Sequence, residues 1–312
     1  MAHTVLFGDP TYFRIKSGSN PHTRDRWGRR KKVDQEKAMA QWILLKKTLE
    51  GQGVRVLVLP PVEDQPGTVF PANAGFRWGN SVYLSHLNPG RKGETDHYRR
   101  IVTSHGFSAV DLVSSYPFEG EADFIPVGDP SGDPGKTVYL FTYGRVRRQR
   151  WAPQLQFPFY RRVYGFRSDR RILPVLQQIV GDREIIPLEL VNEAHYHGDT
   201  VICSFGPHRE QLLVYREALA PNAQAILDNR FGDRLVPLSE SDGRAFAANS
   251  FQIQAVSSTE SAFILIMPDG LTQALYEAVD ALGVIPCPVD VSEFLEKGGG
   301  AVKCMLLDLG EW

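Results

Sequence analysis

Short runs rich in valine and isoleucine recur along the whole chain, and their repetition limits the possible folds more than any other feature. Each run is too short for a helix and has the β-branched composition of a strand. Segments with helical spacing lie between the runs, which favours an α/β or mixed α+β architecture. The expected strands are 4–7, 54–59, 109–113, 137–142, 184–191, 200–205, 250–256, 262–267 and 302–309.

The clearest expected helix begins after Asp34 as its N-cap and ends at Gly51 as its C-cap. Its apolar face consists of Met39, Trp42, Leu45 and Leu49. Further helices are expected at 94–104, 170–180 and 269–282. Because no proline- or serine-rich linker divides the sequence, we expect residues 1–312 to form a single domain.

Overall charge and hydropathy exclude several classes of partner. The chain has 35 basic and 36 acidic residues, so its net charge of −1 gives no general attraction for nucleic acid or an anionic membrane. No apolar run approaches the roughly 18 residues needed to span a bilayer, and MAHTVLFGDP has no basic leader before an apolar run. We therefore expect a cytoplasmic protein without membrane partners; the oligomeric state stays open.

Residues 145–171 depart from this balance, with nine arginines against one acid, Asp169. Aromatic residues interrupt the basic ones, among them Trp151, Phe157, Phe159 and Tyr160. The simplest interpretation is a solvated surface loop. A lid over a site and a platform for single-stranded nucleic acid are the functional alternatives. The near-zero net charge favours the lid, which we place near 145–162.

Acid, amide, imidazole and thiol groups gather in four segments, ANAGF (72–76), FEGEADF (118–124), HYHGDT (195–200) and GGGAVKC (298–304). Three cysteines are too few, and odd in number, for a disulfide framework. Cys304 follows three glycines and Lys303, a setting that suits a reactive thiol, whereas Cys203 and Cys287 resemble small core residues. No His and Cys spacing resembles a zinc site, so we expect no metal and no cofactor.

These segments resemble the guanidino-group-modifying enzymes. HYHGDTVICSFG is similar to their His-Leu-Asp-Thr segment, EFLEKGGGAVKCMLLDL to their carboxy-terminal nucleophile motif, FEGEADF to their Glu-Gly-x-Gly-Asp segment, and TVFPANAGF to the Asn-Ala-Gly loop of the arginine dihydrolase and dimethylarginine dimethylaminohydrolase branch. The four occur in the family's order. Weaker matches extend the resemblance over nearly the whole chain, at DPTYF (9–13), SNP (19–21), YGFRSDRR (164–171), RAFAANS (244–250) and DVSEF (290–294).

The resemblance implies the pentein fold, an α/β propeller of five ββαβ modules around a central channel. It also implies a catalytic set of Cys304 as nucleophile, His197 as general acid and base, and Glu119 as the carboxylate that orients His197. The substrate-binding residues that it implies are Asn73, Asp123, Asp199, Phe13, Asn20 and Arg167.

Some assignments have rivals within the sequence. His195 lies two residues from His197, and Glu121 competes with Glu119 for the orienting role, while Asn73 also suits a plain turn. Two departures from the family put free arginine in doubt as the substrate. Asn88 replaces a basic residue expected to hold a carboxylate, and segment 124–163 is about twenty residues longer than its family counterpart.

The resemblance therefore predicts a cysteine-dependent hydrolase that cleaves a C–N bond of arginine or an arginine derivative through a covalent amidino-cysteine. Its partner would be a small guanidino molecule. An amidinotransferase, which passes the amidino group to an amine, would use the same residues. A non-catalytic pentein that serves as a binding protein is a third possibility, although such a module has no need of a positioned nucleophile and base.

Overall fold

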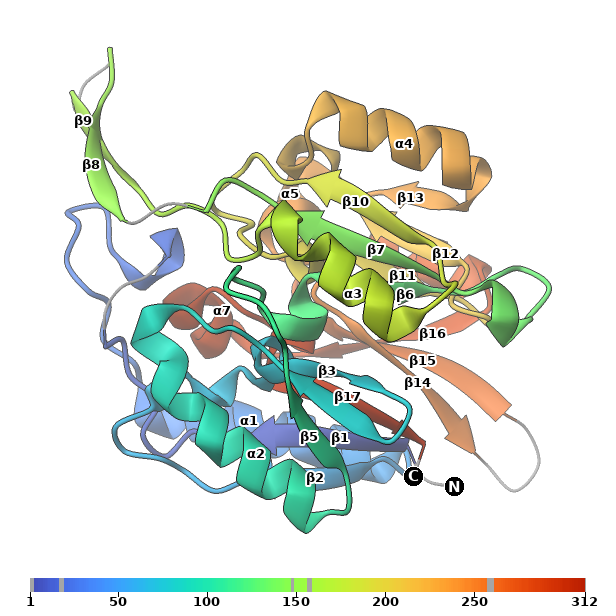
Figure 1. The fold of residues 1–312 in the computed structure, drawn as a ribbon, viewed down its shortest axis with the longest axis horizontal. Helices are drawn as coiled ribbons and strands as arrows, with labels where there is room; N and C mark the ends of the chain where they lie inside the picture. The colour runs from blue at the N-terminus through green and yellow to red at the C-terminus, as the bar shows by residue number, and fades with distance from the viewer. Residues whose placement is uncertain (1–2, 17–19, 147–148, 156–158, 257–260, 312) are drawn as a thin grey trace.

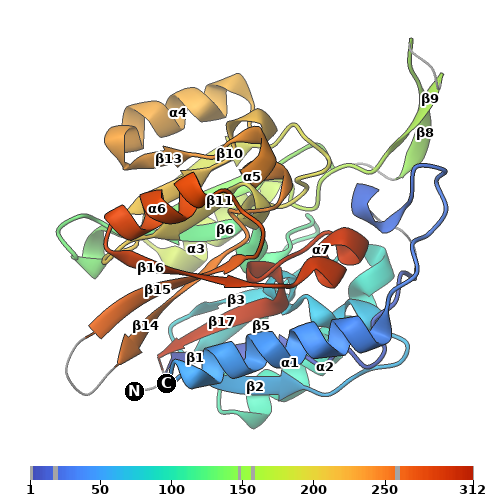
Figure 2. The same cartoon turned by 180° about the vertical axis from the view of Figure 1, so that it is seen from behind.

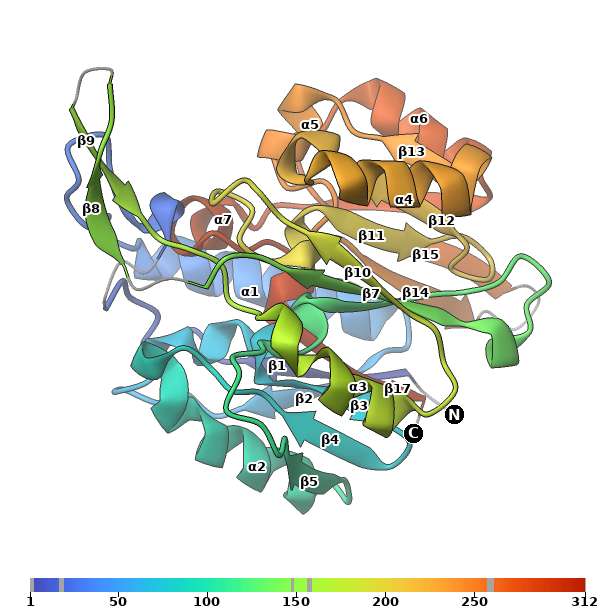
Figure 3. The ribbon, with the colours of Figure 1, turned by 45° about the horizontal axis from the view of Figure 1, so that its top comes forward.

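The computed structural model describes residues 3–16, 20–146, 149–155, 159–256 and 261–311 (Figure 1). Within these residues the strands form five three-stranded sheets and one two-stranded hairpin. The helices lie on the periphery of the molecule and the sheets face its centre, as Figures 1 and 3 show. This is the α/β propeller of five modules expected from the resemblance.

Four sheets follow one chain order: an antiparallel pair of strands, a helix, and a third strand parallel to the second. Their elements are β3 (Gly75–Trp78), β4 (Ser81–Leu84), α2 (Thr95–Ser104) and β5 (Ser108–Asp111); β6 (Phe124–Val127), β7 (Val138–Tyr143), α3 (Leu173–Val180) and β10 (Ile185–Glu189); β11 (Ile202–Phe205), β12 (Gln211–Val214), α4 (Pro221–Phe231) and β13 (Leu235–Pro237); and β14 (Phe251–Val256), β15 (Ser261–Pro268), α6 (Gln273–Ala281) and β16 (Val284–Val289).

The fifth sheet joins the two ends of the chain. Strand β1 (His3–Gly8) leads through α1 (Gln35–Gly51) to the parallel strand β2 (Arg55–Leu59). The last strand, β17 (Leu306–Glu311), pairs antiparallel with β1, with His3 opposite Glu311. Figure 2 shows the two termini together at this sheet. The first and last segments of the sequence thus complete one ββαβ module between them.

Each of the nine expected strand runs overlaps a strand, and the four expected helices are present. Asp34 caps α1 by accepting a hydrogen bond from the Lys37 amide, and three of the four predicted face residues are buried, with Met39 partly so. The predicted C-cap was wrong by one residue, because Gly51 still lies in the helix and Gln52 is the cap. The left-handed residue that ends the turn is Gly53, at φ +80°.

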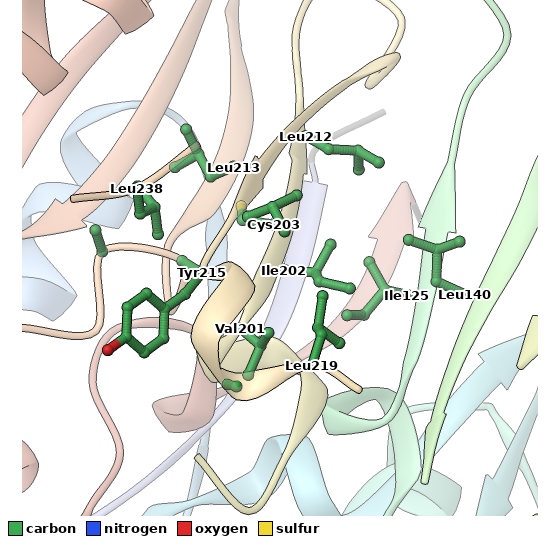
Figure 4. Packing of buried hydrophobic residues seen from close by; sticks show 14 of the residues in the cluster. Ile125, Leu140, Val201, Ile202, Cys203, Leu212, Leu213, Tyr215, Leu219 and Leu238 are labelled. Carbon is green, nitrogen blue, oxygen red and sulfur yellow. The ribbon is translucent and has the colours of Figure 1, made fainter. Parts of the chain in front are cut away.

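The first strands of the modules surround a common cavity of about 360 Å³, lined by side chains of β3, β6, β11, β14 and β17. Outside this ring, apolar side chains of neighbouring modules form the core. Figure 4 shows part of it, where Ile125 of β6, Leu140 of β7 and Ile202 of β11 lie near one another. The buried side chain of Cys203 belongs to this cluster, in agreement with its expected core role.

Three further elements lie outside the modules: α5 (Glu240–Arg244), α7 (Ser292–Gly298) and a hairpin of β8 (Arg150–Pro153) and β9 (Tyr160–Val163). The hairpin projects from the body in Figures 1, 2 and 3. It contains the expected basic and aromatic insertion, of which Arg147, Arg148 and Phe157 lie outside the described residues. No helix in the described part of the chain is long and apolar enough to cross a membrane.

Candidate active site

Four short 3-10 turns carry the polar residues singled out in the sequence, and each turn lies immediately before, or one residue before, the first strand of a module. Because those strands surround one cavity, the turns converge at one end of it. Turn η3 (Pro71–Ala74) holds Asn73, η5 (Gly120–Ala122) is flanked by Glu119 and Asp123, η8 (Gly198–Thr200) follows His197 and holds Asp199, and η11 (Lys303–Met305) holds Cys304.

His197 lies between two carboxylates. Its Nδ1 is 3.0 Å from Oδ2 of Asp123, and its Nε2 is 3.2 Å from Oε2 of Glu119. All three side chains are buried. Burial opposes a charge on the ring, but Asp123 and Glu119 outweigh it and raise the pKa of His197 from 6.5 to about 9. The imidazolium form is therefore favoured at neutral pH, with both N–H groups donating to carboxylates.

The carboxylates of Asp123 and Glu119 differ in how many hydrogen bonds they accept from the protein. Asp123 accepts hydrogen bonds from Thr142 Oγ1 at 2.7 Å, Ser168 Oγ at 2.6 Å and the Gly198 amide at 2.9 Å, in addition to His197. Glu119 accepts from the Asn88 amide at 2.9 Å and borders a cavity. Burial raises the pKa of Glu119, but the hydrogen bond and charge of His197 reverse the shift and lower it to about 2.

Glu121, the rival for the orienting role, faces away from His197 towards Lys303. It pairs with the Lys303 ammonium and accepts the Asp308 amide at 2.9 Å. Burial raises its pKa to about 7 despite the Lys303 charge. His195, the other rival, is packed near the rings of Tyr215 and Phe246. Burial lowers the pKa of His195 to about 4.

Cys304 is buried beside Asp199, with Sγ 3.2 Å from Oδ2 of the carboxylate. The turn needs glycine at position 300, since a Cβ there would come within 2.8 Å of Cys304 Cβ. Burial and the charge of Asp199 raise the pKa of the Cys304 thiol well above its usual value. Burial also raises the pKa of Asp199, to about 6. Its Oδ1 is buried without a hydrogen-bond partner among the described residues.

Asn249 is a site residue to which the sequence assigned no role. Its Nδ2 donates to Cys304 Sγ at 3.2 Å and to the Asp199 carbonyl at 3.1 Å. Its Oδ1 accepts the amides of Ala301 at 2.8 Å and Cys304 at 3.1 Å. Asn249 precedes β14, so it is the contribution of the one module that supplied no predicted residue. The segment RAFAANS contains it, but an amide among alanines gave no chemical signal.

A cavity of about 100 Å³ brings together the remaining predicted residues. Its lining includes Phe13, Asn20, Asn73, Glu119, Arg167 and His197. Phe13 stacks on Phe294 with ring centroids 5.1 Å apart, and Asn20 donates to the Gly298 carbonyl at 2.8 Å. The Arg167 guanidinium lies 5.0 Å from the centroid of the Tyr196 ring. Cys304 is absent from this lining.

Arg91 is a second site residue without a sequence-based assignment. Its Nη1 donates to Asn73 Oδ1 at 2.5 Å, and its Nε and Nη2 pair with Glu94 at 2.9 and 2.7 Å. Asn73 thereby lies between Arg91 and His197, whose Nε2 is 3.3 Å from Asn73 Nδ2. Asn88 stands where the family resemblance leads us to expect a basic residue. Arg91, three residues further along, lines the same cavity and supplies a guanidinium there from a shifted position.

A wider cavity of about 1210 Å³ adjoins the cavity of about 100 Å³, and both are lined by Asn88, Gly90, Glu119 and Arg167. Val146, Gln149, Tyr164 and Phe166, at the base of the hairpin, form part of its wall. Strands β8 and β9 extend away from the body, however (Figure 3), and their residues Trp151 and Tyr160 are exposed. The base of the insertion therefore borders the entrance, but these two aromatic side chains do not cover the site in this structure.

Among the described residues, no group of three or more His, Cys, Asp or Glu side chains is arranged to hold a metal ion. Burial raises the pKa of the Cys203 thiol to about 12, so this thiol stays protonated at neutral pH. Cys287 is half-buried on β16. The groups that could carry out chemistry in this site are thus Cys304, Asp199, His197 and the two carboxylates beside His197.

The family model of N,N dimethylarginine dimethylhydrolase, eukaryotic, matches residues 9–140. A five-module propeller with cysteine, histidine and carboxylates at one end of its channel is the arrangement of the pentein fold, and the chain is similar in sequence and fold to the guanidino-group-modifying enzymes. It is 29% identical over 278 residues to the N(G),N(G)-dimethylarginine dimethylaminohydrolase of Mycobacterium tuberculosis, which covers 89% of this chain and 77% of that protein.

Longer relatives match almost the whole chain. The bifunctional arginine dihydrolase/ornithine cyclodeaminase AgrE of Nostoc sp. is 27% identical over 308 residues, 98% of this chain but 38% of that protein. The chain thus spans about two fifths of such relatives. The N-terminal domain of ArgZ, a cyanobacterial arginine dihydrolase, has been solved bound to substrate; its TM-score is 0.78 at 26% identity, covering 99% of this chain and 98% of that one.

Proposed function

We propose that residues 1–312 form one catalytic domain that hydrolyses a C–N bond of a small guanidino compound through a covalent amidino-cysteine. The observation that carries this proposal is the Cys304–Asp199 pair: a thiol 3.2 Å from a buried carboxylate whose other oxygen has no partner among the described residues. A buried carboxylate with an unused oxygen calls for a hydrogen-bond donor. A guanidinium N–H supplies both the donor and the opposite charge.

Substrate binding would also activate the nucleophile. In the free protein burial and the negative charge of Asp199 hold the proton on Cys304. A guanidinium beside Asp199 cancels that charge and lowers the pKa of the thiol, which releases its proton to solvent as the substrate binds. The Asn249 side chain, which donates to Sγ, stabilises the resulting thiolate.

The chemical steps then balance around His197. The thiolate forms a C–S bond to the guanidinium carbon, and the C–N bond breaks as the imidazolium gives its proton to the departing amine. Water next gives a proton to the neutral imidazole and adds to the carbon. The C–S bond breaks, the ureido product forms, and its extra proton returns to the thiolate. Asp123 and Glu119 hold the ring in place through both transfers.

The division of labour among the carboxylates follows from what each already binds. Asp123 has four protein donors, so we assign it to orienting His197 rather than to the substrate. Glu119 borders the cavity and also contacts His197, and it would serve both the ring and the substrate. Phe13, Asn20, Asn73 and Arg167 would line the substrate's path. The ArgZ domain, also solved covalently bound to a reaction intermediate, supports the covalent route.

The test is a panel of arginine, methylated arginines, agmatine and guanidino acids, assayed for ammonia, methylamine and ureido product. We expect turnover of at least one compound and an amidino adduct on Cys304 in intact mass spectra after rapid quenching. Cys304→Ser should abolish turnover and adduct, whereas Cys203→Ser and Cys287→Ser, the matched controls, should retain both. Turnover by Cys304→Ser would overturn the proposal.

A further inference from the structure

The hairpin arm, defined as residues 149–155 and 159–163, exposes large apolar side chains to solvent. Trp151, Phe159 and Tyr160 are 63%, 62% and 61% exposed, and Leu155 is 99% exposed. Among the described residues, the other exposed aromatic side chains are Tyr12 and Trp27. Figures 1, 2 and 3 show their segment beside the arm, and Pro21 lines a cavity with Arg145 and Arg161.

The arm is a poor structure on its own. Strands β8 and β9 pair only with each other among the described residues. A two-stranded hairpin is at best marginally stable in water, and exposed apolar clusters and open strand edges are normally covered. Glu193 joins the base of the arm to the body: it accepts the amides of Tyr164 and Gly165 and lies 3.9 Å from the Arg161 guanidinium. The outer part of the arm therefore has the properties of a docking element.

The charges indicate what the arm docks on. Segment 145–163, which contains the arm and the residues that lead into it, holds six of the 35 basic residues and none of the 36 acidic ones, which leaves 29 basic against 36 acidic residues elsewhere. A basic arm thus extends from an acidic body. All six basic residues are arginine, without a lysine. Arginine with tryptophan, tyrosine and phenylalanine is the composition of protein–protein interfaces, in which lysine is depleted.

We propose that the arm binds the acidic body of a second copy of this chain, in a reciprocal contact that forms a homodimer. Two identical chains with a basic arm and an acidic body complement each other, as a two-fold interface requires. The three rings, at about 150–250 Å² each and about three-fifths exposed, contribute on the order of 300–450 Å² of the about 800 Å² per partner that a stable contact needs. Leu155 and the arginine stems add to this area. A nucleic acid would meet the same arm but be repelled by the acidic body.

The experiment measures mass by light scattering and sedimentation from micromolar to submillimolar concentration, with circular dichroism as a check on folding. The wild type should dimerise, and the dissociation constant should rise at least tenfold in Trp151→Ala/Tyr160→Ala. Arg150→Glu/Arg161→Glu, which keeps the rings, should have a similar effect. Leu44→Ala/Ile285→Ala removes exposed apolar groups outside the arm and should leave the dimer intact.

Three results would overturn the proposal. They are a monomeric wild type at every concentration, a dimer that survives both arm variants, and a monomer that binds labelled single-stranded oligouridine through the arm. The last result would assign the arm to nucleic acid. Turnover is measured in parallel and tests the proposed hydrolase activity rather than the dimer, because none of the substituted residues lies in the site. Loss of the dimer with unchanged turnover leaves the proposed hydrolase intact.

Discussion

A single carboxylate, Asp199, acts together with burial on the protonation state of the nucleophile Cys304. It contacts Cys304 Sγ through Oδ2 and leaves Oδ1 for the substrate. Its charge adds to burial in keeping the thiol protonated, so we expect the free protein to react slowly with alkylating agents at neutral pH. The residue that disfavours the thiolate in the free protein is therefore the one that recognises the cation.

We expect Asp199→Asn to lower the pKa of the Cys304 thiol, because removing a negative neighbour favours the thiolate. Alkylation by iodoacetamide at neutral pH, followed by mass spectrometry in a Cys203→Ser/Cys287→Ser background, should be faster in the variant. Turnover should fall at the same time, since the guanidinium loses its partner. An alkylation rate that falls, or a pH profile that shifts upwards, would contradict this account of Asp199.

At the scale of elements, the site is assembled by turns rather than by long secondary structure. The turn containing Cys304 is held by Asn249, which precedes β14 and whose side chain forms hydrogen bonds with the Ala301 amide, the Cys304 amide and the thiol itself. Removing these bonds leaves two buried amides without acceptors, at a cost of about 1–3 kcal/mol each. Asn249 thus positions the nucleophile and also stabilises its charge.

We expect Asn249→Ala to lower kcat about 10- to 100-fold, the value of a hydrogen bond to a charged group, with a smaller change in KM. Alkylation of Cys304 should slow in parallel, a readout that a purely structural role far from sulfur would not move. Ser250→Ala is the matched control, because it removes one neighbouring hydrogen bond, to the Ala247 carbonyl, without touching the Cys304 turn. Equal effects of the two substitutions would contradict the assignment.

The sequence predicted strands where apolar residues run together and missed those that are short or interrupted. Strand β3 contains a glycine and an arginine, and β13 has three residues, so neither produces a periodic signal. The site was predicted where a nucleophile, imidazole or carboxylate marks the chemistry. Asn249 and Arg91 were missed because their roles depend on contacts with residues 55 and 18 positions away, which no local pattern encodes.

For the molecule as a whole, the proton on His197 is linked to stability. The pKa of His197 is about 9 in the folded protein and near 6.5 in an unfolded chain. Below about pH 6.5 the stabilisation is complete, and it is lost as the pH rises through 9. Each pKa unit is worth about 1.4 kcal/mol, so the full difference is about 3 kcal/mol.

We therefore expect the Tm of the wild type to fall between pH 6.5 and 9, and this fall to be absent in His197→Gln. His195→Gln is a control of opposite sign. Burial lowers the pKa of His195 to about 4, so its contribution is present above pH 6.5 and is lost towards acid. Differential scanning calorimetry from about pH 4 to about pH 9 measures both. An alkaline fall that persists in His197→Gln would contradict the linkage.

The pairing of β17 with β1 also means that the propeller has a seam whose position is arbitrary. The break between β17 and β1 leaves one first strand at the carboxyl end and its three companions at the amino end. Opening the exposed loop at 130–136, between β6 and β7, and joining the present ends would recreate the same arrangement two modules further on. A circular permutant made in this way keeps every strand pair, so the cyclic order of the modules, rather than their linear order, specifies this fold.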